Sequence, residues 1–171
     1  MDGLARTGYC ASLKRYFHGV REHLIFTPEG RLVFIQQIPG QRHDSQGLYA
    51  LLKSAFKGKL LGDNAYWPRQ AMRQKLEAQG IPVMAESRSN WKFQYTPRTK
   101  KWLKKRRGRV ERRIGLFDAQ FHAGRTLCRS AKHYHARRWT KALAHNLSRH
   151  VNAAKKFPVE SMAHFRLAAA A

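Results

Sequence analysis

Acidic residues are scarce in this sequence: ten Asp and Glu stand against 34 Lys and Arg, a formal net charge of +24 at pH 7. Such a chain repels itself unless a polyanion or a high salt concentration screens its charge. Nucleic acid is the expected partner, because each phosphate that Lys or Arg neutralises releases condensed counterions. An anionic membrane is the competing partner, but membrane binding usually comes with an amphipathic basic helix rather than a mixed core.

Cysteine is also rare. Cys10 and Cys128 are too few for a disulfide scaffold or a four-thiolate zinc site. Cys128 with His133 and His135 would offer only three ligands in a cationic region, which disfavours zinc there. No apolar run approaches the ~18 residues that cross a bilayer, and the first residues lead into no signal-peptide core. These absences predict a soluble cytoplasmic protein without membrane association.

What the sequence does contain is a mixed pattern of short strands and helices. Apolar runs bounded by turn residues predict strands, at residues 16–20, 23–27, 32–35, 59–62 and 81–85. Apolar residues three or four positions apart predict helices, at residues 44–58, 68–80, 110–121 and 139–151. Pro28-Glu29-Gly30 predicts a turn that makes 16–35 an antiparallel hairpin, and Asp44 or Ser45 is the expected cap of the first helix.

This order of elements predicts an α/β layer fold. One domain is expected over residues 1–155, followed by a flexible tail at 156–171, where the apolar pattern disappears. Trp91, Phe93 and Tyr95 fall in a polar stretch, and core packing is favoured for them over stacking on bases.

Two acids are candidates for chemistry. Asp63 follows the apolar run 59–62, and loops at the carboxyl ends of strands in α/β sheets commonly hold ligands. Glu111 is the single acid among ten Lys and Arg between Pro97 and Arg113. Simpler interpretations exist for both: Asp63 can form a turn, and Glu111 can relieve repulsion on a basic helix. Composition alone leaves both open.

The basic run itself predicts a DNA-binding surface whose contacts are mostly to phosphates and therefore little dependent on base sequence. If ~6 phosphates are engaged, log K should fall with log salt with a slope of about −5. The candidate DNA-binding residues are Lys100, Lys101, Lys104, Lys105, Arg106, Arg107, Arg109, Arg112 and Arg113.

An ordered series of short strings, rather than any one motif, resembles a bacterial insertion-sequence transposase of the DDE superfamily. The resemblance spans residues 8–153 and covers the carboxyl-terminal portion of such a protein. Its strings are Gly8–Ser12, Tyr16–Gly19, Pro39–Asp44, Leu60–Tyr66, Arg109–Glu111 and Leu143–Leu147.

The resemblance implies a ribonuclease-H-like mixed sheet with flanking helices, in which three acids hold Mg²⁺ or Mn²⁺ for phosphoryl transfer at DNA ends. Asp63 matches the second acid and Glu111 the third, so both are expected to be catalytic and to bind metal. The family's first Asp lies on a strand that the resemblance does not find here, and Asp2 is no substitute for it. The usual Asp-Lys-Gly-Tyr string reads Asp63-Asn64-Ala65-Tyr66.

A second family signature is also incomplete. Arg107 stands four residues before Glu111 as the pattern requires, but Lys104 takes the place of its Tyr and Asp118 that of its Lys. Because the resemblance finds neither the first strand nor its acid, it implies a truncated transposase. We expect this chain to be inactive on its own.

The leading hypothesis is therefore a DNA-binding transposase, or its remnant, that acts on the double-stranded ends of an insertion sequence at the bacterial nucleoid. The alternative is a non-catalytic basic nucleic-acid-binding protein of ribosomal or nucleoid type. The oligomeric state stays open, with a homodimer as one expected form.

Overall fold

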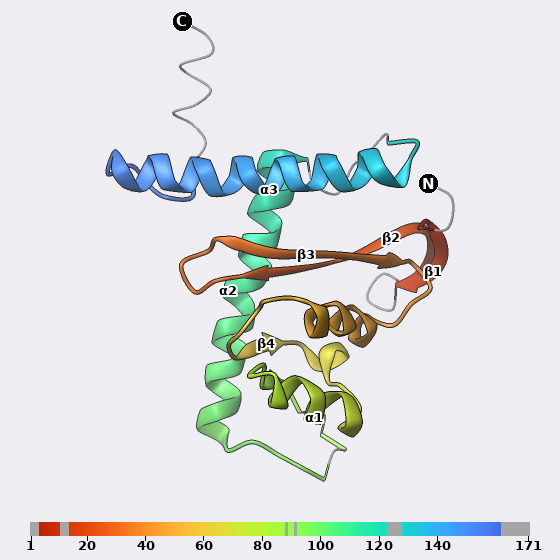
Figure 1. Cartoon of the computed structure of the whole chain (residues 1–171). Helices are drawn as coiled ribbons and strands as arrows, with labels where there is room; N and C mark the ends of the chain where they lie inside the picture. The colour runs from red at the N-terminus through yellow and green to blue at the C-terminus, as the bar shows by residue number, and fades with distance from the viewer. Residues whose placement is uncertain (1–3, 11–13, 88, 91, 123–127, 162–171) are drawn as a thin grey trace, which may run out of the picture. The chain divides into compact units, whose positions relative to one another are not determined.

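The computed structural model describes residues 4–10, 14–87, 89–90, 92–122 and 128–161, which form a mixed α/β structure (Figure 1). This confirms the predicted fold class at the level of α/β. The strands are β1 (Arg6–Cys10), β2 (Arg15–Phe26), β3 (Leu32–Pro39), β4 (Leu60–Gly62) and β5 (Val83–Ala85). The helices are the 3₁₀ helices η1 (Asp44–Lys53) and η2 (Asn64–Tyr66) and the α-helices α1 (Gln70–Ala78), α2 (Pro97–Phe121) and α3 (Ala131–Ala154).

Contacts divide the described chain into two compact units. Unit 1 holds Leu24–Ile35 and the described residues from Arg112 onward. Unit 2 holds the described residues up to His23 together with Gln36–Glu111. Strands β2 and β3 and helix α2 each contribute residues to both units.

The amino-terminal strands form a three-stranded sheet in the order β1-β2-β3. Strand β1 pairs antiparallel to β2, with Gly8 opposite Phe17. The link between β2 and β3 is a short turn in which Gly30 N donates to Thr27 O over 2.9 Å. A connection this short joins antiparallel strands, so the predicted hairpin is confirmed.

A second, two-stranded sheet lies in unit 2 and contributes buried residues to it, among them Leu60, Val83 and Ala85. Strand β4 pairs in parallel with β5, with Leu60 opposite Val83 and Gly62 opposite Ala85. Helix α1 buries Leu76 completely, as the sequence pattern predicts, and the chain reverses at Gly80, whose φ of +76° favours glycine. The apolar spacing of the helix predicted at residues 68–80 also predicts that Ala71 faces inward, which is wrong because Ala71 is exposed.

The helix predicted over 44–58 is shorter and of another kind. It is the 3₁₀ helix η1, which ends at Lys53, and its amino-terminal cap is His43 rather than Asp44 or Ser45. The His43 ring accepts from Ser45 N, while Asp44 pairs with Arg21 over 3.3 Å. The Asp44 carboxylate therefore forms a tertiary ion pair instead of capping the helix, and the local sequence cannot show this.

Unit 1 is built on an apolar cluster of Leu32, Ile35, Phe117 and Ala142. The apolar spacing over residues 110–121 predicts that Ile114 and Phe117 face inward; Phe117 is fully buried as predicted, but Ile114 is 41% exposed, so its placement was wrong. Its ring lies edge-on to His145, with ring centroids 5.5 Å apart. The hairpin residues, the end of α2 and α3 thus share one core.

Helix α3 was predicted correctly as a helix, but its buried face was predicted wrongly. Trp139, Leu143 and Leu147 are 52%, 70% and 58% exposed. The buried face instead carries polar residues, among them Arg138, His145, Ser148, Arg149 and Asn152. Four of these side chains, those of His145, Ser148, Arg149 and Asn152, contact backbone carbonyls of unit 1, which offsets part of the cost of burying polar groups. The Arg138 guanidinium instead lies over the Phe117 ring, 5.6 Å from its centroid.

Core packing was also predicted for the aromatic residues before α2, and for Phe93 this was wrong. Phe93 is 55% exposed and meets Tyr95 edge-on, with ring centroids 4.8 Å apart. Trp91 lies outside the described residues.

Candidate functional site

Asp63 lies where the sequence predicts it, directly after β4. Its carboxylate caps the 3₁₀ helix η2 by accepting from Ala65 N over 2.8 Å. Tyr66, at the end of that helix, donates or accepts a 2.7 Å hydrogen bond with His23 Nδ1, and burial raises the pKa of its hydroxyl. The turn after β4 therefore has a defined conformation that fixes the Asp63 side chain.

Glu111 lies on α2, with its side chain 59% exposed. Arg107, one turn earlier, donates from Nε to Glu111 Oε1 over 2.7 Å. Arg107 also donates from Nη1 to Glu86 Oε2 over 3.2 Å. The hydrogen bond to Glu111 raises the pKa of the guanidinium, and Glu86 adds to that shift. One arginine thus holds two carboxylates.

Glu86 is the residue of this site that sequence analysis missed. It follows β5 just as Asp63 follows β4. Since the register pairs Gly62 with Ala85, Asp63 and Glu86 leave the parallel sheet at the same edge. The available signal was that both acids follow short apolar strands, and parallel strands bring their carboxyl ends together.

A groove of about 490 Å³ lies beside this edge of unit 2. Its lining combines Lys side chains with both glutamates that Arg107 holds. The lining residues are Glu86, Ser87, Lys100, Leu103, Lys104, Arg107, Gly108 and Glu111. Cations and carboxylates therefore face the same space, a composition suited to phosphate on one side and a cation on the other.

The described acids do not make a complete two-metal centre. Within the part of the chain that the structure describes, no three His, Cys, Asp or Glu side chains are grouped so that they could hold a metal ion. Glu111 is engaged with Arg107 and Asp63 with Ala65 N. Two carboxylates with these partners are too few ligands to fix two divalent ions. That Asp63 and Glu111 bind the same metal ions, as the family resemblance implies, stays a prediction.

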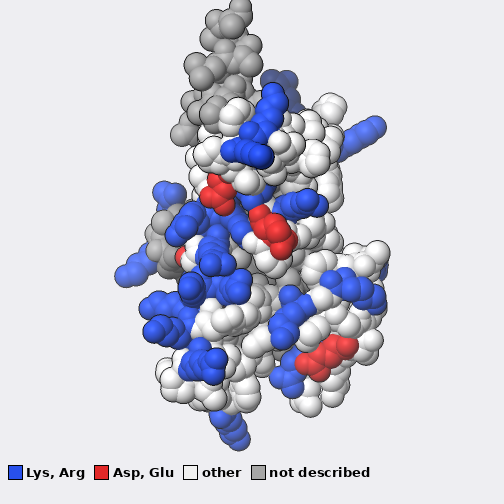
Figure 2. Space-filling model, turned by 90° about the vertical axis from the view of Figure 1, so that its left-hand side faces the viewer, with Lys and Arg blue, Asp and Glu red and all other residues white. Residues whose placement is uncertain are grey.

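Helix α2 carries the basic run. Lys101, Lys105 and Arg109 are exposed and recur every four residues, so they lie along one side of the helix. Leu103, which is only 3% exposed, lies on the opposite side and anchors the helix in unit 2. Figure 2 shows a face on which blue side chains far outnumber red ones. This charge pattern fits the backbone of a nucleic acid.

Four members of the predicted DNA-binding set contact other parts of the protein, one of them being Lys100, which donates from Nζ to Gln94 Oε1 over 2.8 Å. Arg107 holds the two glutamates, and Arg113 donates from Nη1 to Thr27 O over 2.8 Å within unit 1. Arg106 lies over the Trp102 ring at 5.4 Å. The strongest candidates for phosphate contacts are therefore the exposed members for which no such contact is found within the described part of the chain, namely Lys101, Lys104, Lys105, Arg109 and Arg112.

The histidines divide by exposure. His23 and His145 are 5% and 4% exposed, so direct contact of either ring with DNA is disfavoured. Burial lowers the pKa of both rings. His18 and His43 are exposed, and His43 caps η1.

A comparison with protein families finds a match over residues 4–147 to the family described as "Transposase DDE domain". No curated protein and no solved structure matches this sequence. Among the described residues, none of the helices combines the length and the apolar character that a membrane span requires.

Proposed function

Because the chain belongs to the transposase DDE domain family, we propose that it binds double-stranded DNA at insertion-sequence ends as part of DNA transposition. The single observation that carries this proposal is the family match over residues 4–147, which includes β4, the edge with Asp63, and the whole basic helix α2. A transposition-related function follows from the family. The DNA-binding role of α2 and a ribonuclease-H-like arrangement of the sheet are our proposals, as is action at the bacterial nucleoid.

DNA binding by the whole chain is tested by competition. A fluorescent 30-base-pair duplex is bound in about 0.1 M salt and then challenged with vesicles of anionic lipid at equal phosphate concentration. We expect the duplex to stay bound, because phosphates on a stiff duplex match a rigid basic helix. Loss of the duplex to the vesicles would favour a membrane-active cationic protein and contradict the proposal.

We further propose that Asp63 and Glu111 are two of the acids through which a divalent ion is held against DNA. The family generally uses divalent metal ions, and carboxylate oxygens suit Mg²⁺ or Mn²⁺. The reaction that such ions support is metal-assisted phosphoryl transfer at a DNA strand end. With only these two acids the chain alone should bind ions weakly and should not cleave DNA.

Mn²⁺ binding followed by electron paramagnetic resonance tests the pair. We expect a millimolar Kd, typical of an incomplete carboxylate site, and about tenfold weaker binding after D63N or E111Q. If both acids contact one ion, the double variant should be hardly weaker than either single variant, since the effects of groups that share one ligand do not add. The control is E77Q, which removes an exposed acid of helix α1. Additive losses, or losses equal to that of E77Q, would refute a shared ion.

A further inference from the structure

Unit 1 contains two arginines that the turn between β2 and β3 holds side by side. Arg113 from α2 donates to Thr27 O and to Pro28 O. Arg149 from α3 donates to Glu29 O. Gly30 shows how close they are, since a Cβ built on it would lie 2.7 Å from Arg149 Nη2 and 3.0 Å from Arg113 Nε. The turn thus fixes two guanidinium groups in one place.

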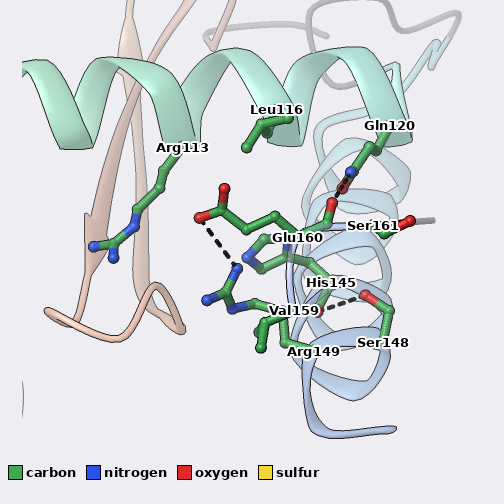
Figure 3. A pocket seen from close by; sticks show the side chains of 9 residues that line it. All are labelled: Arg113, Leu116, Gln120, His145, Ser148, Arg149, Val159, Glu160 and Ser161. Atoms are coloured by element: carbon green, nitrogen blue, oxygen red, sulfur yellow. Dashed lines mark hydrogen bonds and ion pairs between the residues drawn. The ribbon is translucent and has the colours of Figure 1, made fainter. Parts of the chain in front are cut away.

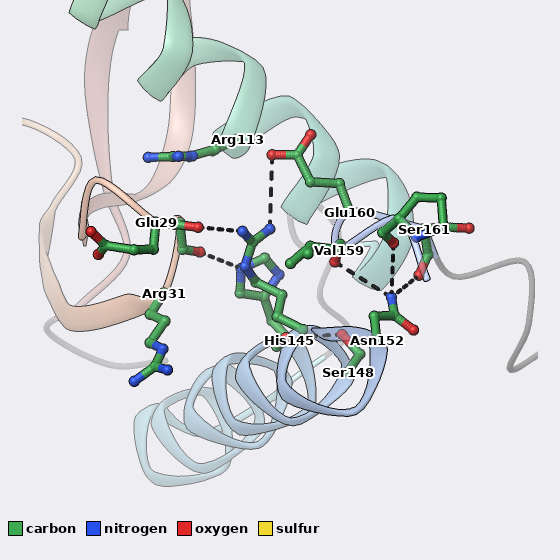
Figure 4. Close-up of polar contacts among 12 residues, drawn as sticks. Glu29, Arg31, Arg113, His145, Ser148, Asn152, Val159, Glu160 and Ser161 are labelled. Atoms are coloured by element: carbon green, nitrogen blue, oxygen red, sulfur yellow. Dashed lines mark hydrogen bonds and ion pairs between the residues drawn. The ribbon is translucent and has the colours of Figure 1, made fainter. Parts of the chain in front are cut away.

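Two like charges at this spacing need an anion. The Glu160 carboxylate pairs with Arg149, as Figure 3 shows, and both residues line one small pocket with Arg113. Glu160 Oε1 lies 3.8 Å from Arg149 Nη1, an ion pair longer than a hydrogen bond. Arg31 adds a third positive charge beside the turn (Figure 4). Glu29 adds a second carboxylate that interacts with Arg31 and Arg113, so three guanidinium groups face two carboxylates and their charge is compensated incompletely.

The Glu160 side chain can leave while its backbone stays. Asn152 Nδ2 donates to the carbonyls of Pro158, Val159 and Ser161, and Gln120 donates to Glu160 O over 2.6 Å. The side chain of Glu160 is nevertheless 45% exposed. Rotation of that side chain into solvent would open the site without moving the segment that carries it.

The space behind the carboxylate is small and polar. A cavity of about 10 Å³ is lined by Arg113, Arg149, Glu160 and the buried His145. His145 Nε2 lies 3.1 Å from Gly30 O, and its Nδ1 is buried without a hydrogen-bond partner among the described residues. A cavity of this size holds about one water, so a larger anion must take the place of the carboxylate rather than share the cavity.

We propose that Arg113 and Arg149 form an oxyanion site for a phosphate group, which the Glu160 carboxylate fills in this structure. A phosphate offers several oxygens to two guanidinium groups, whereas Glu160 reaches Arg149 at ion-pair distance only. The source of the phosphate is either inorganic phosphate or the backbone of DNA. The inference stands apart from the proposed role of helix α2, because free phosphate tests it without DNA.

Titration of the full chain with inorganic phosphate, followed by the NMR signals of the arginine Nε–H groups, tests the site. We expect E160Q to bind phosphate about tenfold more tightly than the unchanged chain, because the competing charge is gone. E77Q is the matched control: it also neutralises a half-exposed glutamate paired with an arginine, but in unit 2. Equal effects of E160Q and E77Q, or no effect of either, would overturn the proposal.

A second measurement identifies the source of the phosphate and does not depend on the first. If the DNA backbone is the ligand, E160Q should raise the affinity for a 30-base-pair duplex several-fold more than E77Q does, although both add one positive charge. If E160Q strengthens the binding of inorganic phosphate but not the binding of the duplex, the site binds the free phosphate ion. Because Glu160 is half exposed, its substitution should leave the fold intact, and the thermal unfolding curve of each variant checks this.

Discussion

Replacing Lys101, Lys105 and Arg109 by Gln should weaken DNA binding by about two orders of magnitude at 0.1 M salt. The three side chains lie along one exposed side of α2, so a single DNA backbone can meet all of them. Each lost phosphate contact lowers the slope of log K against log salt by about 0.9, which predicts a slope smaller by about 2.7. Fluorescence anisotropy titrations of a labelled duplex at several salt concentrations between about 50 and 200 mM measure both the DNA affinity and its salt slope.

The matched control removes three other lysines from exposed positions of unit 2. Lys53, Lys59 and Lys75 lie in or beside η1, β4 and α1, so their replacement by Gln changes the net charge of the chain by the same amount. If DNA binds specifically to the α2 surface, the slope of log K against log salt should change by less than about 1 in this control. If both triple variants lose affinity equally, DNA binds the whole cationic molecule and α2 is no defined interface.

The sequence predicted the secondary structure best where a residue's use is local. Strand β4, helix α1 and the Gly80 reversal follow from apolar spacing and from a conformation that glycine prefers, and all were found. The cap of η1 was missed because Asp44 pairs with Arg21, a residue 23 positions away. Local propensity cannot show which of two uses such a side chain will serve.

Helix α3 shows the limit of hydrophobic patterning. Its Trp139, Leu143 and Leu147 repeat every four residues and predict an inward stripe, yet all three are exposed. Asn146, which is half-buried, accepts from Leu32 N over 2.9 Å and donates to Leu32 O over 2.8 Å. These bonds and that of Arg149 to Glu29 O tie the polar face of the helix to the hairpin. The spacing of apolar residues cannot predict such bonds, because the partners Leu32 and Glu29 lie more than a hundred positions away in the sequence.

The candidate site was half predictable for a similar reason. Asp63 and Glu111 could be found because few acids exist in the chain and each sits in a distinctive context. Glu86 could be found only from the pairing of β4 with β5, because the parallel register puts it at the same edge as Asp63. Its bond to Arg107, a residue 21 positions later, is a product of the fold.

Replacing Phe117 by Ala should destabilise the protein by about 3–5 kcal/mol, the usual loss for a fully buried phenylalanine. Phe117 is the centre of the unit 1 core. Its ring contacts the rings of Phe121 and His145, at centroid distances of 5.6 and 5.5 Å, and the Arg138 guanidinium lies 5.6 Å from its centroid. The variant leaves a cavity and also removes the aromatic face beside a buried charge. Urea unfolding followed by tryptophan fluorescence measures the change.

Ile114 is the control on the same helix, one turn before Phe117. It is 41% exposed, whereas Phe117 is fully buried, so I114A should cost below about 1 kcal/mol although both substitutions leave an alanine on α2. An equal loss of unfolding free energy for the two variants would mean that unit 1 does not pack around Phe117. A loss confined to F117A, at an unchanged dependence on urea concentration, places the stability of α2, α3 and the hairpin residues in one cooperative core.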